Sequence, residues 1–167
     1  QLARQARRGQ NHEGEQSMSD HQEASAHPEL YARIESSFVR QGMMKHLGAR
    51  LVSVAPGEVE IALPYSERVT QQQGGYHGGA MGALADIAAG YAGLTMAAEG
   101  QEVTTVEYKI NFLAAFQGGE LRARGHVVRA GKRLIITTAE VVHLDDDGGE
   151  SPCALMQQTL ATVKQTY

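Results

Sequence analysis

The spacing of apolar residues along the chain predicts two helices and six strands. Apolar residues recur at helical spacing after Pro28, a residue that suits a first helical turn, so a helix is expected over about residues 28–45. Further along, apolar and polar residues alternate, as they do in half-buried strands. A turn at Pro56-Gly57 divides the first such stretch into a hairpin over residues 50–64. The later strands are expected over about residues 103–115, 119–130, 133–144 and 153–164.

The last four strands are expected to form an antiparallel meander. Turns that contain glycine separate them, at Gly118-Gly119, Ala130-Gly131-Lys132 and Asp145-Asp146-Asp147-Gly148-Gly149. The aspartates of the last turn lack the spacing of a calcium-binding loop, so a solvated turn is expected there. This order of elements predicts an α+β domain in which one helix has most of the sheet to cover it. A single sheet keeps an open face and two edges, so self-association is also expected.

A stretch from Gly79 to about Ala98 is expected to form one long central helix, because it lacks proline and is dominated by alanine, leucine and methionine. At about 100° per residue, its small residues fall on one arc with Asp86 at the middle. These small residues are Gly79, Gly82, Ala83, Gly90, Gly93 and Ala97. The opposite face carries a core-facing apolar set, which comprises Met81, Leu84, Ile87, Ala88, Tyr91 and Leu94.

Each glycine inside a helix destabilises it by about 1 kcal/mol relative to alanine, so the arc of small residues requires an explanation. Two interpretations are open. Either another backbone packs closely there, with Asp86 as a satisfied buried group, or the arc borders a ligand. The preceding run Tyr76-His77-Gly78-Gly79 favours the ligand, since it places glycines where the first-turn N–H groups are unpaired and the helix dipole is positive. Amide donors aimed at one oxygen, with a carboxylate two turns further along, are the arrangement that acyl transfer requires.

The run HGGAMGALAD, in which Asp86 stands nine positions after His77, resembles the signature of hotdog-fold acyl-CoA thioesterases of the PaaI-like, phenylacetate-pathway type. The resemblance extends over most of residues 41–163. It implies that residues 27–167 form a single α+β domain with the hotdog fold, in which a curved antiparallel sheet wraps a long central helix. It also implies a homo-oligomer, either a dimer or a dimer of dimers, with the sites between protomers.

The same resemblance implies a role for several positions around this motif. Asp86 corresponds to the nucleophile or general base, and the amides of Gly78 and Gly79 correspond to the oxyanion hole. His77 either orients the thioester or locks the loop by hydrogen bonding. Gln71, fifteen residues before the carboxylate, corresponds to a Gln or Asn that contacts the attacking water or the carboxylate.

Further site residues follow from the strand after the helix and from the glycines of the helix itself. Family members place a Ser or Thr near the start of that strand, close to the lytic water, and Thr105 matches this position with Thr104 beside it. Some relatives carry a hydroxyl one turn after the carboxylate, where this chain has Gly90. The small residues Gly82, Ala83, Gly90 and Gly93 leave room for an aryl or medium-chain acyl group.

Coenzyme A is expected as part of the substrate, without a separate cofactor or a metal. Its phosphates favour basic side chains, and Arg129, Lys132 and Arg133 flank a Gly-Lys turn that is common in the family. Three functions stay open at this point. The first is an acyl-CoA thioesterase that releases free acid and CoA. The second is a hydratase or dehydratase of hydroxyacyl thioesters, and the third is a module that binds acyl-CoA or a small ligand without catalysis.

Composition and charge argue against several classes of partner and location. The chain of 167 residues suits one domain, and its net charge of −4 gives no reason to expect nucleic-acid binding. The lone Cys153 excludes an intrachain disulfide framework. There is no apolar run of membrane-spanning length and no hydrophobic signal core, so a cytoplasmic protein without membrane contact is expected. Residues 1–26 are polar and expected to be flexible, and the first 17, which precede Met18, are expected to be upstream or non-native sequence.

Overall fold

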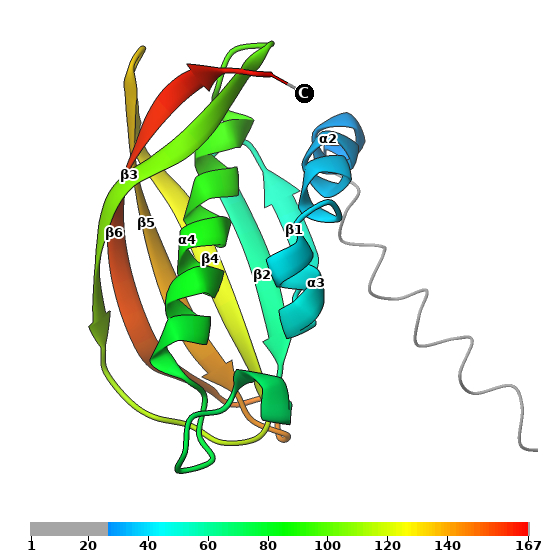
Figure 1. Cartoon of the computed structure of the whole chain (residues 1–167), viewed down its shortest axis with the longest axis vertical. Coiled ribbons are helices and arrows are strands. Elements are labelled where there is room, and N and C mark those ends of the chain that lie inside the picture. Colours follow the sequence, from blue (N-terminus) through cyan, green and yellow to red (C-terminus); the bar gives the residue numbers. More distant parts are fainter. Residues whose placement is uncertain (1–26, 167) are drawn as a thin grey trace, which may run out of the picture.

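A long helix, α4 (Gly78–Thr95), runs across the inner face of a curved six-stranded antiparallel sheet (Figure 1). The computed structural model describes residues 27–166. The arrangement is the hotdog fold that the sequence predicts, although α4 extends from Gly78 to Thr95 rather than from Gly79 to about Ala98. The prediction for residues 1–26 concerns a segment outside the described residues.

The first predicted helix is divided in two, which corrects the single helix expected over residues 28–45. The structure has α2 (Pro28–Phe38) and α3 (Gly42–Leu47) instead. Between them Gln41 adopts an extended backbone (φ −77°, ψ 102°), and its side-chain amide donates a 2.8 Å hydrogen bond to the hydroxyl of Tyr91 on α4. A tertiary contact therefore accompanies the break in a helix that local spacing favours.

The sheet has the strand order β1-β2-β4-β5-β6-β3, and every neighbouring pair is antiparallel. The strands are β1 (Arg50–Ala55), β2 (Glu58–Pro64), β3 (Gln101–Phe112), β4 (Glu120–Ala130), β5 (Leu134–Leu144) and β6 (Glu150–Lys164), and a short 3-10 helix, η2 (Glu67–Val69), precedes α4. The predicted hairpins β1–β2, β4–β5 and β5–β6 are all present. Helices α2 and α3 lie beside β1, at one side of the sheet (Figure 1).

The last four strands do not form a simple meander, which corrects the predicted hairpin at Gly118-Gly119. β3 pairs with β6 at the far edge of the sheet, and β4 pairs with β2 and β5 in its middle. Residues 113–119 therefore cross from an edge strand back to a central one. The reason lies in burial: β4 places the fully buried Leu121 and Ala123 beneath α4, so its backbone groups need a strand on each side, whereas β3 is mostly exposed and takes the edge.

The core-facing side of α4 agrees with the helical projection. Ile87 is the one member of the predicted set that is half-buried rather than buried. The buried members are Met81, Leu84, Ala88, Tyr91 and Leu94. These side chains fix the rotation of α4 about its own axis, and they turn Asp86 away from the core and toward β3.

Candidate active site

Strand β3 covers Gly78, the first residue of α4, and the N-terminal half of the small-residue arc. A Cβ at Gly78 would lie 3.2 Å from the Phe112 ring, and a Cβ at Gly82 would lie 3.4 Å from the Tyr108 hydroxyl. These glycines make room for aromatic side chains of the same chain, so close packing explains this part of the arc. The expected acyl-binding place of Gly82, Ala83 and Gly93 is not observed in the single chain, because none of the three lines the pocket beside Asp86. At Gly93 the space is filled by the Leu160 side chain.

The carboxylate of Asp86 is held in one orientation by two side chains. Its Oδ1 accepts a 2.7 Å hydrogen bond from the Thr105 hydroxyl on β3 and a second hydrogen bond from the side-chain amide of Gln158 on β6. The same amide lies 3.1 Å from the Thr105 hydroxyl. Both hydrogen bonds reach one oxygen, and Oδ2 has no hydrogen-bond partner within residues 27–166. The structure thus brings the predicted Asp86 and Thr105 together and leaves one carboxylate oxygen available.

A fully buried amide–hydroxyl pair supports this carboxylate. The Thr137 hydroxyl on β5 donates a 2.9 Å hydrogen bond to Oε1 of Gln158, and both side chains are fully buried. With Oε1 occupied, the amide nitrogen of Gln158 faces Asp86. Sequence reasoning missed both residues. A signal exists in the alternation of β5 and β6, where each is a polar residue in an inward-facing row that is otherwise mostly apolar.

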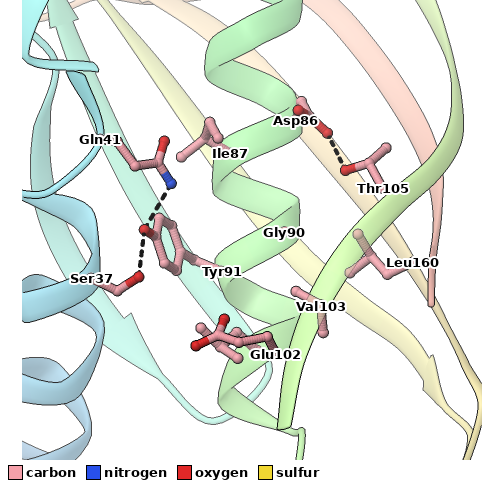
Figure 2. A pocket seen from close by; sticks show the side chains of 11 residues that line it. Ser37, Gln41, Asp86, Ile87, Gly90, Tyr91, Glu102, Val103, Thr105 and Leu160 are labelled. Atoms are coloured by element: carbon pink, nitrogen blue, oxygen red, sulfur yellow. Dashed lines mark hydrogen bonds between the residues drawn. The ribbon is translucent and has the colours of Figure 1, made fainter. Parts of the chain in front are cut away.

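A pocket of about 170 Å³ opens beside Asp86, between α4, β3 and the C-terminal end of α2 (Figure 2). Asp86 and Thr105 lie at one end, and Tyr91 and Glu102 lie at the other. Gly90 lies between the two ends, and a Cβ at this position would meet no atom within 4 Å, so the predicted open space is present here. The lining residues, none of which is basic, are Ser37, Gln41, Asp86, Ile87, Gly90, Tyr91, Leu94, Glu102, Val103, Thr105 and Leu160.

The start of α4 offers one free amide rather than the predicted two. The His77 side chain caps the helix, because its Nδ1 accepts a 2.8 Å hydrogen bond from the Gly79 N–H. The Gly78 N–H has no hydrogen-bond partner in the described part of the chain, as is usual for the first residue of a helix. Gly78 and Asp86 are about 12 Å apart along the helix axis, since the rise is about 1.5 Å per residue. One chain therefore cannot place both groups on a single carbonyl group.

The remaining predicted residues lie away from the pocket. Gln71 lies in the turn before α4, where its Oε1 accepts a hydrogen bond from the Gln73 N–H. Thr104 is exposed on β3 and does not line the pocket. The basic residues at and beside the β4–β5 turn, which are exposed and also outside the pocket, are Arg129, Lys132 and Arg133. Their contacts to CoA stay a prediction.

The cysteine lies outside this pocket, and the described residues form no cluster of metal-binding side chains. Cys153 is buried, and burial raises the pKa of its thiol to about 11, so the thiol stays protonated at neutral pH. Within residues 27–166, no group of three or more His, Cys, Asp or Glu side chains is arranged to hold a metal ion. The same part of the chain contains no helix with the length and apolarity to cross a membrane.

Comparisons with known proteins lead to one family. The model of the thioesterase superfamily matches residues 73–150, which include His77, Asp86 and Thr105. A solved thioesterase family protein from Silicibacter pomeroyi is 37% identical with a TM-score of 0.78, over 81% of this chain and 99% of that one. The 1,4-dihydroxy-2-naphthoyl-CoA hydrolase of Listeria monocytogenes is 31% identical over 124 residues, which are 74% of this chain and 98% of the hydrolase. The PaaI protein of E. coli, at 22% identity and a TM-score of 0.72 over 82% of this chain and 95% of its own, shares the fold.

Proposed function

The chain belongs to the thioesterase superfamily, and from this premise we propose that it hydrolyses acyl-CoA thioesters to a free acid and CoA with Asp86 as the reacting carboxylate. The observation that supports the proposal is an aspartate held by Thr105 and Gln158 at one end of a pocket, with one oxygen unpartnered. The printed name of the Listeria monocytogenes relative supports a CoA thioester as the substrate class.

Two chemical routes use the free oxygen Oδ2 of Asp86. As a nucleophile, it bonds to the thioester carbonyl carbon and expels the CoA thiolate, and water then cleaves the mixed anhydride to the free acid and the original carboxylate. As a general base, it takes a proton from a water whose oxygen bonds to the same carbon, and the intermediate expels the thiolate, which takes up that proton. In both routes the thioester oxygen gains negative charge and needs hydrogen-bond donors.

The donor for this oxygen comes, in our proposal, from a second copy of the chain. The Gly78 N–H is free but about 12 Å from Asp86 of its own chain. An antiparallel α4 in a partner protomer would bring its Gly78 to this Asp86. The edge strand β3 offers a surface for such pairing, because within residues 27–166 no strand pairs with it on one side, and it exposes Val106 (58%) and Phe112 (51%). We therefore infer a homo-oligomer, a dimer or a dimer of dimers, in which Gly78 and Gln71 of one protomer complete the site of the other.

Mixing two inactive variants tests the shared site. Asp86→Asn removes the carboxylate, and Gly78→Pro removes the amide N–H at the first helical position, which tolerates proline. Each variant alone is expected to lose most of its activity. A mixed dimer, purified through two different affinity tags, is expected to recover about half of the native activity, because one of its two symmetric sites then combines Asp86 with an intact Gly78 amide.

The control for this experiment is Gly78→Ala, which keeps the N–H and adds a methyl group against the exposed ring of Phe112. Its loss of activity should be much smaller than that of Gly78→Pro. Mixed dimers without recovery would contradict the shared site, and another donor than the Gly78 N–H would then have to stabilise the thioester oxygen.

Gly90→Ala is expected to stabilise the fold and to narrow the acyl pocket. Alanine favours an interior helical position by about 1 kcal/mol over glycine, and the new methyl group would meet no atom within 4 Å. We expect Tm to rise by roughly 2–4 °C. The methyl group would occupy space beside Asp86, so kcat/KM should fall for benzoyl-CoA by about tenfold and for acetyl-CoA by much less.

Gly93→Ala is the matched control on the same arc. A Cβ at Gly93 would overlap the Leu160 side chain, so this variant is expected to lower Tm. Equal changes in Tm for the two variants would contradict the open space at Gly90.

Thiol release from a panel of aryl and medium-chain acyl-CoAs tests the proposed function on the native protein. Release of CoA together with the free acid supports hydrolysis. Addition of water to an enoyl-CoA without release of CoA would instead identify a hydratase. Tight binding of acyl-CoAs without turnover would identify a binding module.

A further inference from the structure

Gln158 and Thr137 lie opposite each other in the pairing of β6 with β5, on the face of the sheet that packs against α4. Both side chains are polar and fully buried. Their neighbours in the two inward-facing rows are buried and apolar: Ile135, Ala139, Met156 and Leu160. Two apolar side chains of similar shape in place of such a pair would be nearly neutral for stability or would raise it. The stability of the core therefore does not explain why an amide and a hydroxyl lie here.

The hydrogen bonds around this pair have one consistent direction, which runs toward Asp86. An ionised carboxylate only accepts hydrogen bonds, so the amide of Gln158 and the hydroxyl of Thr105 both donate to Oδ1 of Asp86. The single proton of the Thr105 hydroxyl is used there, and its oxygen, 3.1 Å from Nε2 of Gln158, is left to accept from that amide. The opposite end of the amide, Oε1, accepts a 2.9 Å hydrogen bond from Thr137. Every polar atom of Gln158 is thus committed.

The pair reaches the reacting atoms only through Asp86 and Thr105. Neither Gln158 nor Thr137 lines the pocket, so neither side chain contacts a substrate there. Their hydrogen bonds act on the orientation of the carboxylate, because two donors on Oδ1 oppose its rotation about the Cβ–Cγ bond. The other oxygen, Oδ2, then keeps one direction.

On the basis of the proposed function, we propose that Gln158, anchored by Thr137, is a positioning residue that sets Oδ2 of Asp86 toward the thioester or the attacking water. Without the amide, Oδ1 keeps only the hydroxyl of Thr105, and the carboxylate spends part of its time in unproductive orientations. A reacting atom misplaced by about 1 Å lowers the rate by up to about 10²-fold. The pocket walls are unaltered by this loss, so it appears in kcat rather than in KM.

Three single variants test this role, by thiol release from benzoyl-CoA or octanoyl-CoA, whichever the native protein hydrolyses faster. Gln158→Met keeps the length of the side chain and removes the amide, so kcat should fall about 10- to 100-fold and KM should change less than about twofold. Thr137→Val keeps the methyl group that faces α4 and removes the anchor, so kcat should fall about threefold to tenfold. Thr137→Ser keeps the hydroxyl and should restore kcat to within about twofold of native.

The melting temperature separates positioning from packing, because the two roles predict different relations between Tm and kcat. Thr137→Ser loses a buried methyl group, so its Tm should fall by roughly 2–4 °C while kcat stays near native. The double variant Thr137→Val/Gln158→Met leaves no polar atom of the pair unpaired, so its Tm should equal or exceed the native value. Its kcat should nevertheless stay about 10- to 100-fold below native.

The chain offers a matched control for the double variant, one residue further along each strand. Thr138 and Gln157 are paired in the same way, but their side chains point to the opposite face of the sheet, away from α4. Thr138→Val/Gln157→Met therefore makes the same two chemical changes in the same two strands. Native kcat and KM are expected for it.

The outcomes distinguish this inference from the function on which it rests. Native kcat in Gln158→Met, or in the double variant, would overturn Gln158 as a positioning residue while hydrolysis stands. Values of kcat that follow Tm across all the variants would assign the pair to the core alone and would overturn the inference as well. A native protein that hydrolyses no acyl-CoA would overturn the proposed function itself, and the inference with it.

Discussion

Asp86→Asn is expected to reduce kcat for acyl-CoA hydrolysis by roughly 10²- to 10⁴-fold while the fold stays intact. Asparagine has the same shape, and its side-chain oxygen is able to accept the hydrogen bonds that Thr105 and Gln158 now donate to Oδ1. The variant loses only the ionised Oδ2, which is the oxygen that attacks the carbonyl carbon or takes the proton. KM should change little, because the walls of the pocket are unaltered.

The measurement is a thiol-release assay for kcat and KM, paired with a thermal melt. Asp146→Asn makes the same chemical change in the exposed β5–β6 turn and serves as the control, with native kcat and Tm expected. Native kcat in Asp86→Asn would exclude this carboxylate as the reacting group. A fall in kcat together with a large fall in Tm would assign the effect to folding.

Much of the fold was predictable because its signals are local. The apolar face of α4 and the alternation within the strands follow from side-chain periodicity, and the observed bounds agree closely with the predicted ones. The place of β3 beside β6 was not predictable in this way, since alternation specifies which face of a strand is buried and not which strand lies next to it. The break at Gln41 is likewise accompanied by a contact with Tyr91, 50 positions away in the sequence, which local spacing does not reveal.

The residues of the candidate site likewise fall into those with a local sequence signal and those brought together only by the fold. Asp86 and the glycines at the start of α4 stand close together in one motif, so a site there could be proposed from residue types, spacing and the family resemblance, and their roles stay a prediction. Gln158 and Thr137 reach Asp86 only through the pairing of β5 with β6 and the packing of α4 on both. Tyr91 was assigned to the core, which is correct for its ring, but it also lines the pocket, and its hydroxyl bonds to Ser37 and Gln41.

The glycines of α4 show why residue type alone does not reveal a pocket. Gly82 and Gly90 are both glycines on the same face of α4, so the sequence does not distinguish them. The first is filled by the hydroxyl of Tyr108, and the second faces open space. The difference is set by β3, whose aromatic side chains end before they reach Gly90. A helical face made of small residues therefore predicts either close packing or a ligand. In α4 the part at Gly82 packs against β3, and the part at Gly90 borders the pocket.

Gly125→Ala is expected to lower the free energy of unfolding by about 3 kcal/mol. Gly125 lies in the middle of the sheet, where β4 passes directly beneath α4. A Cβ at this position would overlap the backbone carbonyl of Ala88 and lie 2.5 Å from the backbone nitrogen of Ala89. Helix backbone atoms are unable to rotate aside as a side chain does, so α4 must move away from the sheet as a body. A loss of this size corresponds to a fall in Tm of roughly 6–12 °C.

The same displacement should reach the site, because Ala88 follows Asp86 by two residues on α4. Moving α4 outward lengthens the hydrogen bonds of Asp86 to Thr105 and Gln158, so kcat measured well below Tm is expected to fall as well. Urea unfolding gives the stability change, and Gly90→Ala, which adds the same methyl group to open space on α4, serves as the stability control with the opposite sign. A native urea midpoint for Gly125→Ala would contradict the close helix–sheet contact. A native kcat despite lower stability would show instead that the hydrogen bonds of Thr105 and Gln158 to Asp86 persist when α4 moves.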